Sequence, residues 1–124
     1  MAINIDIDGS TAVPVNFTLK KNKKVVDKVE TSFDFADNHF EQFTKELNKF
    51  QKISDDTSLA DLKPKLKKLV DSSLGDGVFD RIYAVRPACN DIAAFLLMAM
   101  AMVAEEHNKD LGLDKVRKYM KNNA

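Results

Sequence analysis

The chain has 124 residues, of which 44% are hydrophobic, and its 19 basic and 19 acidic residues give a formal net charge of zero. This composition predicts one globular domain, residues 1–124, and argues against a protein whose main partner is nucleic acid, because such proteins carry an excess of lysine and arginine. A single cysteine, Cys89, excludes an internal disulfide and indicates a reducing cytoplasm, and the alternating residues at the start do not resemble a signal peptide.

Alternating apolar residues near the start of the chain predict an antiparallel β arm of two or three strands. Residues 3–7 alternate isoleucine with polar residues, residues 13–19 alternate apolar residues again, and a polar turn around Asn22 precedes a third candidate strand over residues 25–31. Pro14 has no amide hydrogen and is expected at a strand start or edge. The apolar face of this arm is either covered by the helices that follow or paired with a neighbouring molecule.

Apolar residues at steps of three and four predict helices in the rest of the chain. An aromatic stripe over residues 40–50 follows Asp37, which is a good N-cap. A second helix can be capped by Ser58 or Asp61 and contains Pro64, which is tolerated only near a first turn. The residues before this proline are therefore either the start of the second helix or a separate turn.

A glycine-rich break ends the second helix. Residues 75–77, Gly-Asp-Gly, stop the helix, and a short helix over residues 78–83 follows. A phosphate-binding loop is the weaker reading, because the Gly-Lys-Ser/Thr ending is missing. Asp80 and Arg81, just after the break, are expected to pair locally.

A long helix over about residues 88–107, with Pro87 at its first turn, and a final amphipathic piece over residues 113–120 complete the chain. The expected fold class is α+β and mainly α. A β arm, residues 1–31, is followed by a bundle, residues 33–122, of four to five helices around the long central helix.

The central helix contains thirteen consecutive residues, 92–104, without a polar side chain. A helix that is apolar on every side must be surrounded by its own fold, by copies or by partners. It rises only about 20 Å, short of the roughly 30 Å of bilayer hydrocarbon, so we expect no membrane span. Methionine and phenylalanine fill cores, which is the default reading, but they also form adaptable partner grooves. The candidate partner-binding residues are Phe95, Met98, Met100 and Met102.

Other reactive groups predict no catalytic, cofactor or metal site. The acidic and histidine residues at 105–110 match no metal-ligand spacing and indicate a solvated helix end. His39 is expected at the surface, and Cys89 is expected to be a small buried residue rather than a nucleophile. Two lysine clusters, residues 20–28 and 63–68, lack the aromatic residues and arginines of a nucleic-acid surface.

Several short motifs follow the β arm in order. Phe-Asp-Phe at residues 33–35 precedes the aromatic stripe, Leu-Gly-Asp-Gly-Val-Phe-Asp-Arg-Ile-Tyr spans residues 74–83, and Pro87, the apolar helix and Glu-Glu at residues 105–106 follow. Over residues 33–108 this order resembles small uncharacterised proteins of tailed phages and prophages of Gram-positive bacteria. These proteins are similar to the tail assembly chaperones made between the major tail protein and the tape measure.

The resemblance implies a non-enzymatic, mainly helical protein of the bacterial host cytoplasm that coats the tape-measure protein and helps recruit tail-tube subunits. It carries over no catalytic residue. The β arm lies outside the resemblance, so the alternative is a structural tail or neck component of the virion that oligomerises through this arm. An enzyme ranks last, because two histidines and one cysteine do not assemble a nucleophile, a base and an orienting group. The expected partners are tape-measure and tail-tube proteins or further copies of the chain, without nucleic acid, membrane or cofactor.

Overall fold

The chain folds into a hairpin followed by helices. A computed structural model describes residues 2–52, 57–112 and 120. Its elements, in chain order, are β1 (Ala12–Lys21), β2 (Lys24–Asp34), α1 (Asp37–Gln51), α2 (Leu59–Leu74), α3 (Val78–Val85) and α4 (Cys89–Asp110). The expected α+β, mainly α class is confirmed. The last predicted helical piece, residues 113–120, lies outside the described residues except for Met120.

β1 and β2 form an antiparallel hairpin with a two-residue turn. Lys21 pairs with Lys24 across the turn, and the turn residues Asn22 and Lys23 have φ of 50° and 68°. Two consecutive positive φ values are typical of a type I′ turn, whose twist matches that of the strands it joins. The expected polar turn is therefore confirmed.

The predicted first strand is wrong. Its isoleucines Ile3, Ile5 and Ile7 are 89%, 78% and 88% exposed, and they belong to no strand in the described part of the chain. Alternation indicates a preference for extended backbone, but a strand also needs a paired edge and a covering layer. The two-stranded alternative is the one observed. The strand predicted over residues 25–31 is β2, and it continues to Asp34.

α1 packs only part of its aromatic stripe inward, since Phe40 is 45% exposed, and the predicted cap does not form. Asp37 is the first helical residue, and Ala36, which offers no side-chain cap, occupies the N-cap position. The carboxylate of Asp34 accepts a hydrogen bond from the Ala36 N–H at 2.9 Å and orders this junction instead. Phe43 is buried, and its ring meets Phe33 edge-on with the ring centroids 5.1 Å apart.

α2 contributes many of the buried side chains of the core. Ser58 caps it by accepting a hydrogen bond from the Asp61 N–H at 3.4 Å, so one of the two predicted caps is confirmed. The helix runs on from Leu59, so no separate turn forms, and Pro64 lies exposed inside the helix. The α2 residues that are at most 2% exposed are Leu66, Leu69, Val70 and Ser73.

The break between α2 and α3 forms as predicted. Gly77, with φ of 86°, precedes α3 in a left-handed conformation that glycine adopts without steric cost. The Asp71 carboxylate on α2 accepts a hydrogen bond from the Phe79 N–H at 3.0 Å and thereby caps α3 from another helix. This arrangement is the predicted helix stop.

The predicted local pairing of Asp80 and Arg81 is wrong. Asp80 accepts a hydrogen bond from Lys67 on α2 at 2.9 Å, whereas Arg81 bonds Asp27 on β2. Adjacent residues on a helix point in different directions, so each finds a partner on a different element.

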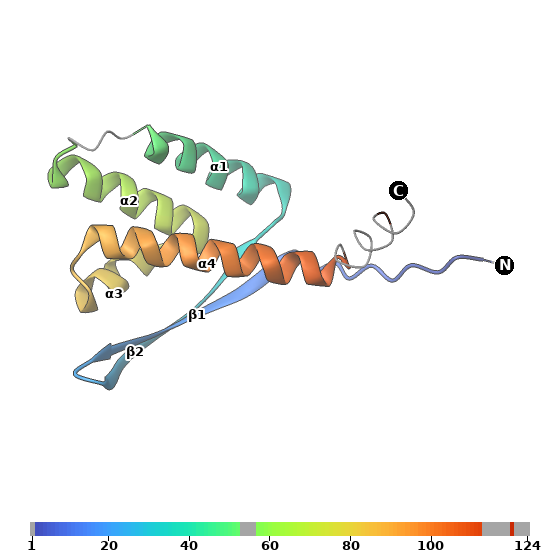
Figure 1. The fold of residues 1–124 in the computed structure, drawn as a ribbon, viewed down its shortest axis with the longest axis horizontal. Helices are drawn as coiled ribbons and strands as arrows, with labels where there is room; N and C mark the ends of the chain where they lie inside the picture. Colours follow the sequence, from blue (N-terminus) through green and yellow to red (C-terminus); the bar gives the residue numbers. More distant parts are fainter. Residues whose placement is uncertain (1, 53–56, 113–119, 121–124) are drawn as a thin grey trace.

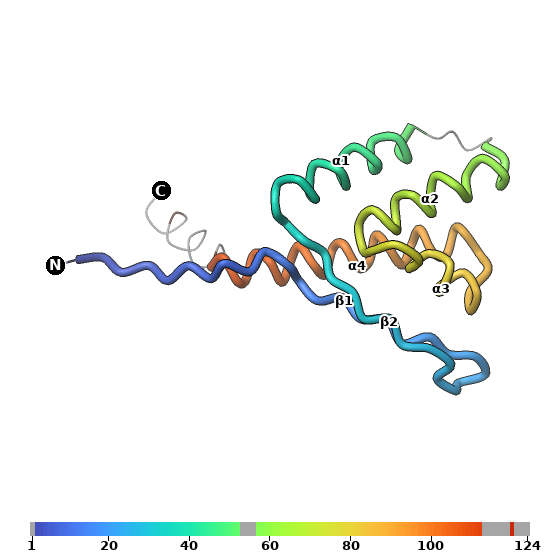
Figure 2. Tube along the Cα trace, turned by 180° about the vertical axis from the view of Figure 1, so that it is seen from behind, coloured from blue at the N-terminus to red at the C-terminus, as the bar shows by residue number. Residues whose placement is uncertain are grey.

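α4 is the longest helix of the described chain and extends beyond its predicted end at residue 107. In both views it runs between the α1–α2 pair and the hairpin (Figure 1; Figure 2). One side of α4 joins the core, and its buried residues are Cys89, Ile92, Leu96, Ala99 and Val103.

Candidate binding surface on α4

α4 is covered on one side and open on the others. Of the alternatives that the sequence leaves open, cover by the chain's own fold holds for only part of this helix. Phe95, Leu97, Met98 and Met102 are 36%, 65%, 59% and 65% exposed. The apolar side chains of α4 point in all directions around the helix, but the hairpin and the α1–α2 pair cover only part of its circumference. Large apolar side chains therefore stay at the surface.

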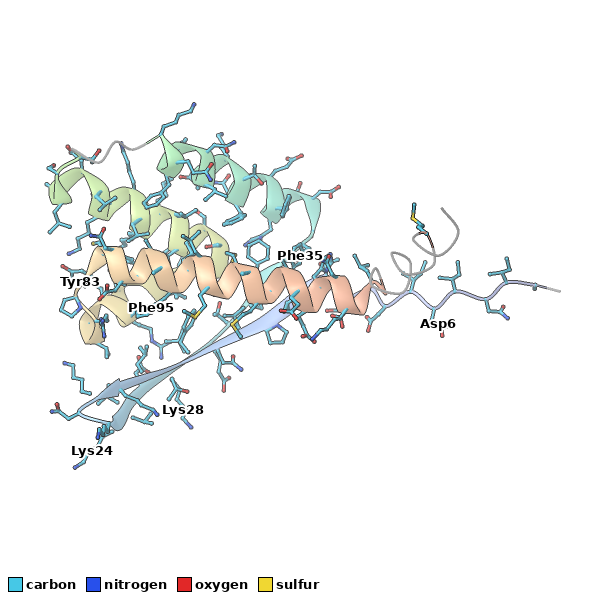
Figure 3. All side chains as sticks on the ribbon, viewed as in Figure 1. Asp6, Lys24, Lys28, Phe35, Tyr83 and Phe95 are labelled. Carbon is cyan, nitrogen blue, oxygen red and sulfur yellow. The ribbon has the colours of Figure 1, made fainter. Side chains whose placement is uncertain are left out.

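A groove of about 630 Å³ lies between α4 and β1. We call it the β1–α4 groove. Its α4 wall carries three of the four predicted partner-binding residues. Figure 3 shows Phe95, labelled, on the stretch of α4 that borders the hairpin. The residues that line the groove are Val13, Pro14, Val15, Asn16, Phe17, Phe95, Met98, Ala99, Met102, Val103 and Glu106.

The groove follows the free edge of β1. Five consecutive residues, 13–17, line it, whereas one face of a strand presents only alternate residues. The Phe35 N–H donates to the Thr11 carbonyl at 2.9 Å, so these two residues form a hydrogen-bonded pair of the ladder. In an antiparallel ladder, hydrogen-bonded pairs alternate with pairs that exchange no hydrogen bond. Counting from Thr11, Pro14 and Asn16 belong to the second kind, so their main-chain groups point away from β2. Pro14 thus lies at a strand edge, as expected.

A second, smaller hollow of about 250 Å³ separates α4 from α1. We call it the α1–α4 cleft. The predicted partner-binding residue Met100 lines this cleft and is partly buried, so it lies apart from the other three, which line the β1–α4 groove. Leu97, which the sequence did not single out, lies in the cleft and is exposed. The lining residues are Phe33, Phe35, Phe40, Phe43, Leu47, Leu96, Leu97, Met100, Val103 and Ala104.

The predicted helix end at residues 105–107 is solvated only in part. Glu105 and Glu106 are exposed, but the His107 ring stacks on Phe35 with the centroids 3.8 Å apart and an interplanar angle of 9°. This stack joins the end of α4 to the loop between β2 and α1. The periodicity of the long helix gives no signal for a contact with a loop residue so far away in the sequence.

The cysteine and the second histidine are buried or partly buried. Cys89 is 5% exposed and is a free thiol, as expected. His39 is partly buried, contrary to the expectation of a surface histidine, because its Nδ1 lies 2.8 Å from the Asp34 carbonyl oxygen. The residues that the structure describes hold no group of three or more histidine, cysteine or acidic side chains that could bind a metal ion.

The lysines of residues 63–68 have separate partners. The Lys63 Nζ lies 3.9 Å from the centroid of the Tyr83 ring. The hydrogen bond from Lys67 to Asp80 raises the pKa of the Lys67 ammonium. Tyr83 and Asp80 both belong to α3, so Lys63 and Lys67 join α2 to α3.

Glu46 on α1 is a buried carboxylate. It is 4% exposed, and its Oε1 lies 3.5 Å from the Lys49 Nζ and 3.6 Å from the Lys68 Nζ on α2. Burying a carboxylate is unfavourable unless it is paired, and these two ammonium groups pair it. The contact joins α1 to α2.

Among the described residues, we find no helix with the length and apolar content needed to cross a bilayer. Comparison of the chain with protein-family models, with curated proteins and with solved structures finds no match.

Proposed function

We propose that the protein is a non-enzymatic, tail-assembly chaperone-like protein that acts in the cytoplasm of a bacterial host. Its clients are the tape-measure protein, the tail-tube protein or both. The observation that supports this proposal is the set of large apolar side chains that α4 exposes, because surfaces of this kind on soluble proteins mark sites of interaction.

The client segment that fits the α1–α4 cleft is an amphipathic helix. The cleft lies between two helices, and Leu97 stands beside it with 65% of its surface exposed. Ala94 and Ala101 lie one turn before and one turn after Leu97 on the same side of α4, and both are exposed. Small residues around one large apolar residue allow a second helix to approach closely and to bury that residue.

Co-expression with the tape-measure and tail-tube proteins of the same locus tests this proposal. A stable complex on size exclusion is expected, and Leu97→Asp should abolish it, because a carboxylate would be buried without a partner. Leu59→Asp is the matched control, since Leu59 is 60% exposed but lies at the start of α2. Elution of the chain and both clients as separate species would refute the proposal.

A second candidate is a structural tail or neck component that oligomerises through its β arm. It is supported by the exposed isoleucines of residues 3–7, which are available to another molecule. The two candidates differ in one observable. A structural component is retained in purified virions, whereas a chaperone is absent from them.

A further inference from the structure

We propose that residues 3–7 of a second copy of the chain add as a third strand to the free edge of β1. In this arrangement Ile3, Ile5 and Ile7 of one copy occupy the β1–α4 groove of another. The inference concerns self-association, and it does not depend on the identity of any client.

The donor segment has the pattern of a half-buried strand but is not buried. Its three isoleucines alternate with polar residues, and each isoleucine is at least 78% exposed. Isoleucine is favoured in strands, and three exposed isoleucines on one side of an extended segment form a continuous apolar strip. Such a strip is stabilised when a sheet edge and an apolar wall cover it.

The acceptor groove offers both of these features. Its β1 wall is the free edge of a strand, at which the Pro14 and Asn16 carbonyls and the Asn16 N–H point away from β2. Apart from Glu106, its α4 wall is apolar and includes Met98 and Met102, which are 59% and 65% exposed. Pro14 lacks an N–H, which removes one hydrogen bond from the added ladder and leaves its carbonyl as an acceptor.

The lengths of donor and acceptor agree. Five residues of β1, 13–17, line the groove, and the donor has five residues, 3–7. Each stretch spans about 13 Å at the rise of a strand. With the isoleucines on the same side as Val13, Val15 and Phe17, the polar residues Asn4 and Asp6 fall on the solvent side.

The direction of the chain at Thr11 favours a donor from another copy. The Thr11 carbonyl accepts a hydrogen bond from the Phe35 N–H, and the Thr11 hydroxyl donates to the Asp34 carboxylate. The hairpin ladder therefore continues to Thr11, and the donor segment leaves the body in the same direction. Figure 3 shows Asp6 well beyond the end of α4, away from Phe95 in the groove of its own copy.

Self-association of the full chain tests the proposal. Light scattering coupled to size exclusion should show a mass above that of the monomer, and this mass should rise with protein concentration. Ile5→Asp should weaken the association more than about tenfold, because one buried isoleucine contributes at least the 1.4 kcal/mol that corresponds to tenfold. Asp6→Asn is the matched control and should associate like the unaltered chain, since Asp6 lies on the solvent side.

A mixing experiment distinguishes two arrangements. In one, residues 3–7 bind the groove of another copy, and in the other they fold back into the groove of their own copy. Ile5→Asp has a defective donor and an intact groove, whereas Met98→Asp has an intact donor and a defective groove. Each variant alone should be monomeric, and their mixture should form a one-to-one complex. Circular dichroism should show unchanged helix content in both variants, because Ile5 and Met98 are exposed in the fold.

Three results would overturn the proposal. The first is a monomeric unaltered chain at every concentration. The second is self-association that survives Ile5→Asp. The third is a mixture of the two variants that stays monomeric. None of these results bears on client binding through Leu97, which is tested with its own variant.

Discussion

Arg81 on α3 holds Asp27 on β2 through two hydrogen bonds, 2.9 Å from Nε to Oδ2 and 2.6 Å from Nη2 to Oδ1. The same Nη2 also donates to the Lys28 carbonyl at 2.9 Å. One guanidinium therefore binds a side chain and the main chain of the hairpin, beyond the part of the hairpin that α4 covers.

Arg81→Lys should loosen the far half of the hairpin while the helices stay intact. A lysine keeps the charge but cannot form the planar two-bond contact. The expected result is faster amide hydrogen exchange in β1 and β2 near the turn, with unchanged exchange in α2. Lys67→Arg is a suitable control, since Lys67 also forms an exposed ion pair on a neighbouring helix. Equal protection of the hairpin in Arg81→Lys and the unaltered chain would contradict this prediction.

The ion pair between Arg81 and Asp27 also predicts that the stability of the fold depends on pH. The hydrogen bond from Arg81 lowers the pKa of Asp27 below its ordinary value of 3.8. A carboxyl group whose pKa is lower in the folded state contributes stability that is complete above its unfolded pKa and is lost as the pH falls through the lowered value. The stability gap between the unaltered chain and Asp27→Asn should therefore be present near neutral pH and should close below about pH 4.

Thermal melts across this range measure the gap. Asp34 also has a lowered pKa, because the Thr11 hydroxyl donates to it, so the unaltered chain as a whole loses stability in acid. The gap between the two chains isolates Asp27 from this background. A gap that stays constant down to the lowest pH would show that the Arg81 contact does not favour the charged carboxylate.

Lys23→Gly should stabilise the hairpin. Lys23 has φ of 68°, a left-handed conformation that costs a residue with a Cβ about 1–2 kcal/mol. Glycine removes this cost but increases the entropy of the unfolded chain, so the net gain is about 0.5 kcal/mol. Lys24→Gly, one residue later at the first position of β2, should instead destabilise by about 0.5 kcal/mol. Chemical denaturation of both variants measures whether each substitution raises or lowers the free energy of unfolding.

Pro64→Ala should stabilise the protein by about 1–3 kcal/mol. Pro64 lies inside α2, where it cannot donate a hydrogen bond to the carbonyl four residues earlier. Its side chain is exposed, so alanine removes little packing. Lys65→Ala is the control, and its effect should stay within about 0.5 kcal/mol because Lys65 is also exposed. A destabilised Pro64→Ala variant would mean that the proline contributes to folding through the unfolded chain.

The sequence predicts much of the local structure, although the Asp37 cap and the strand over residues 3–7 do not form, and it predicts contacts between distant elements poorly. The hairpin turn, the break at Gly77 and the Ser58 cap depend on neighbouring residues, and all three formed as predicted. The partners of Arg81 and His107 lie on elements far away in the sequence. No periodicity within one helix specifies such a partner.

The candidate site was predicted in part for the same reason. Phe95, Met98 and Met102 were chosen as large apolar residues of one helix, and they do line one groove. Met100 lies in the α1–α4 cleft, and the exposed Leu97 was missed. Which side of an all-apolar helix is covered depends on how the other elements pack, and the apolar run itself carries no information about this.

Truncating two adjacent leucines of α4 tests which side is covered. Leu96 is 4% exposed and Leu97 is 65% exposed. Leu96→Ala should cost about 2–5 kcal/mol, because it leaves a cavity in the core. Leu97→Ala should change the stability of the isolated chain by less than about 0.5 kcal/mol, since its side chain is already largely in water. Urea denaturation at low protein concentration measures both values. A large cost for Leu97→Ala would mean that another part of the chain covers this side of α4 in solution, and the client-binding proposal would then lose its surface.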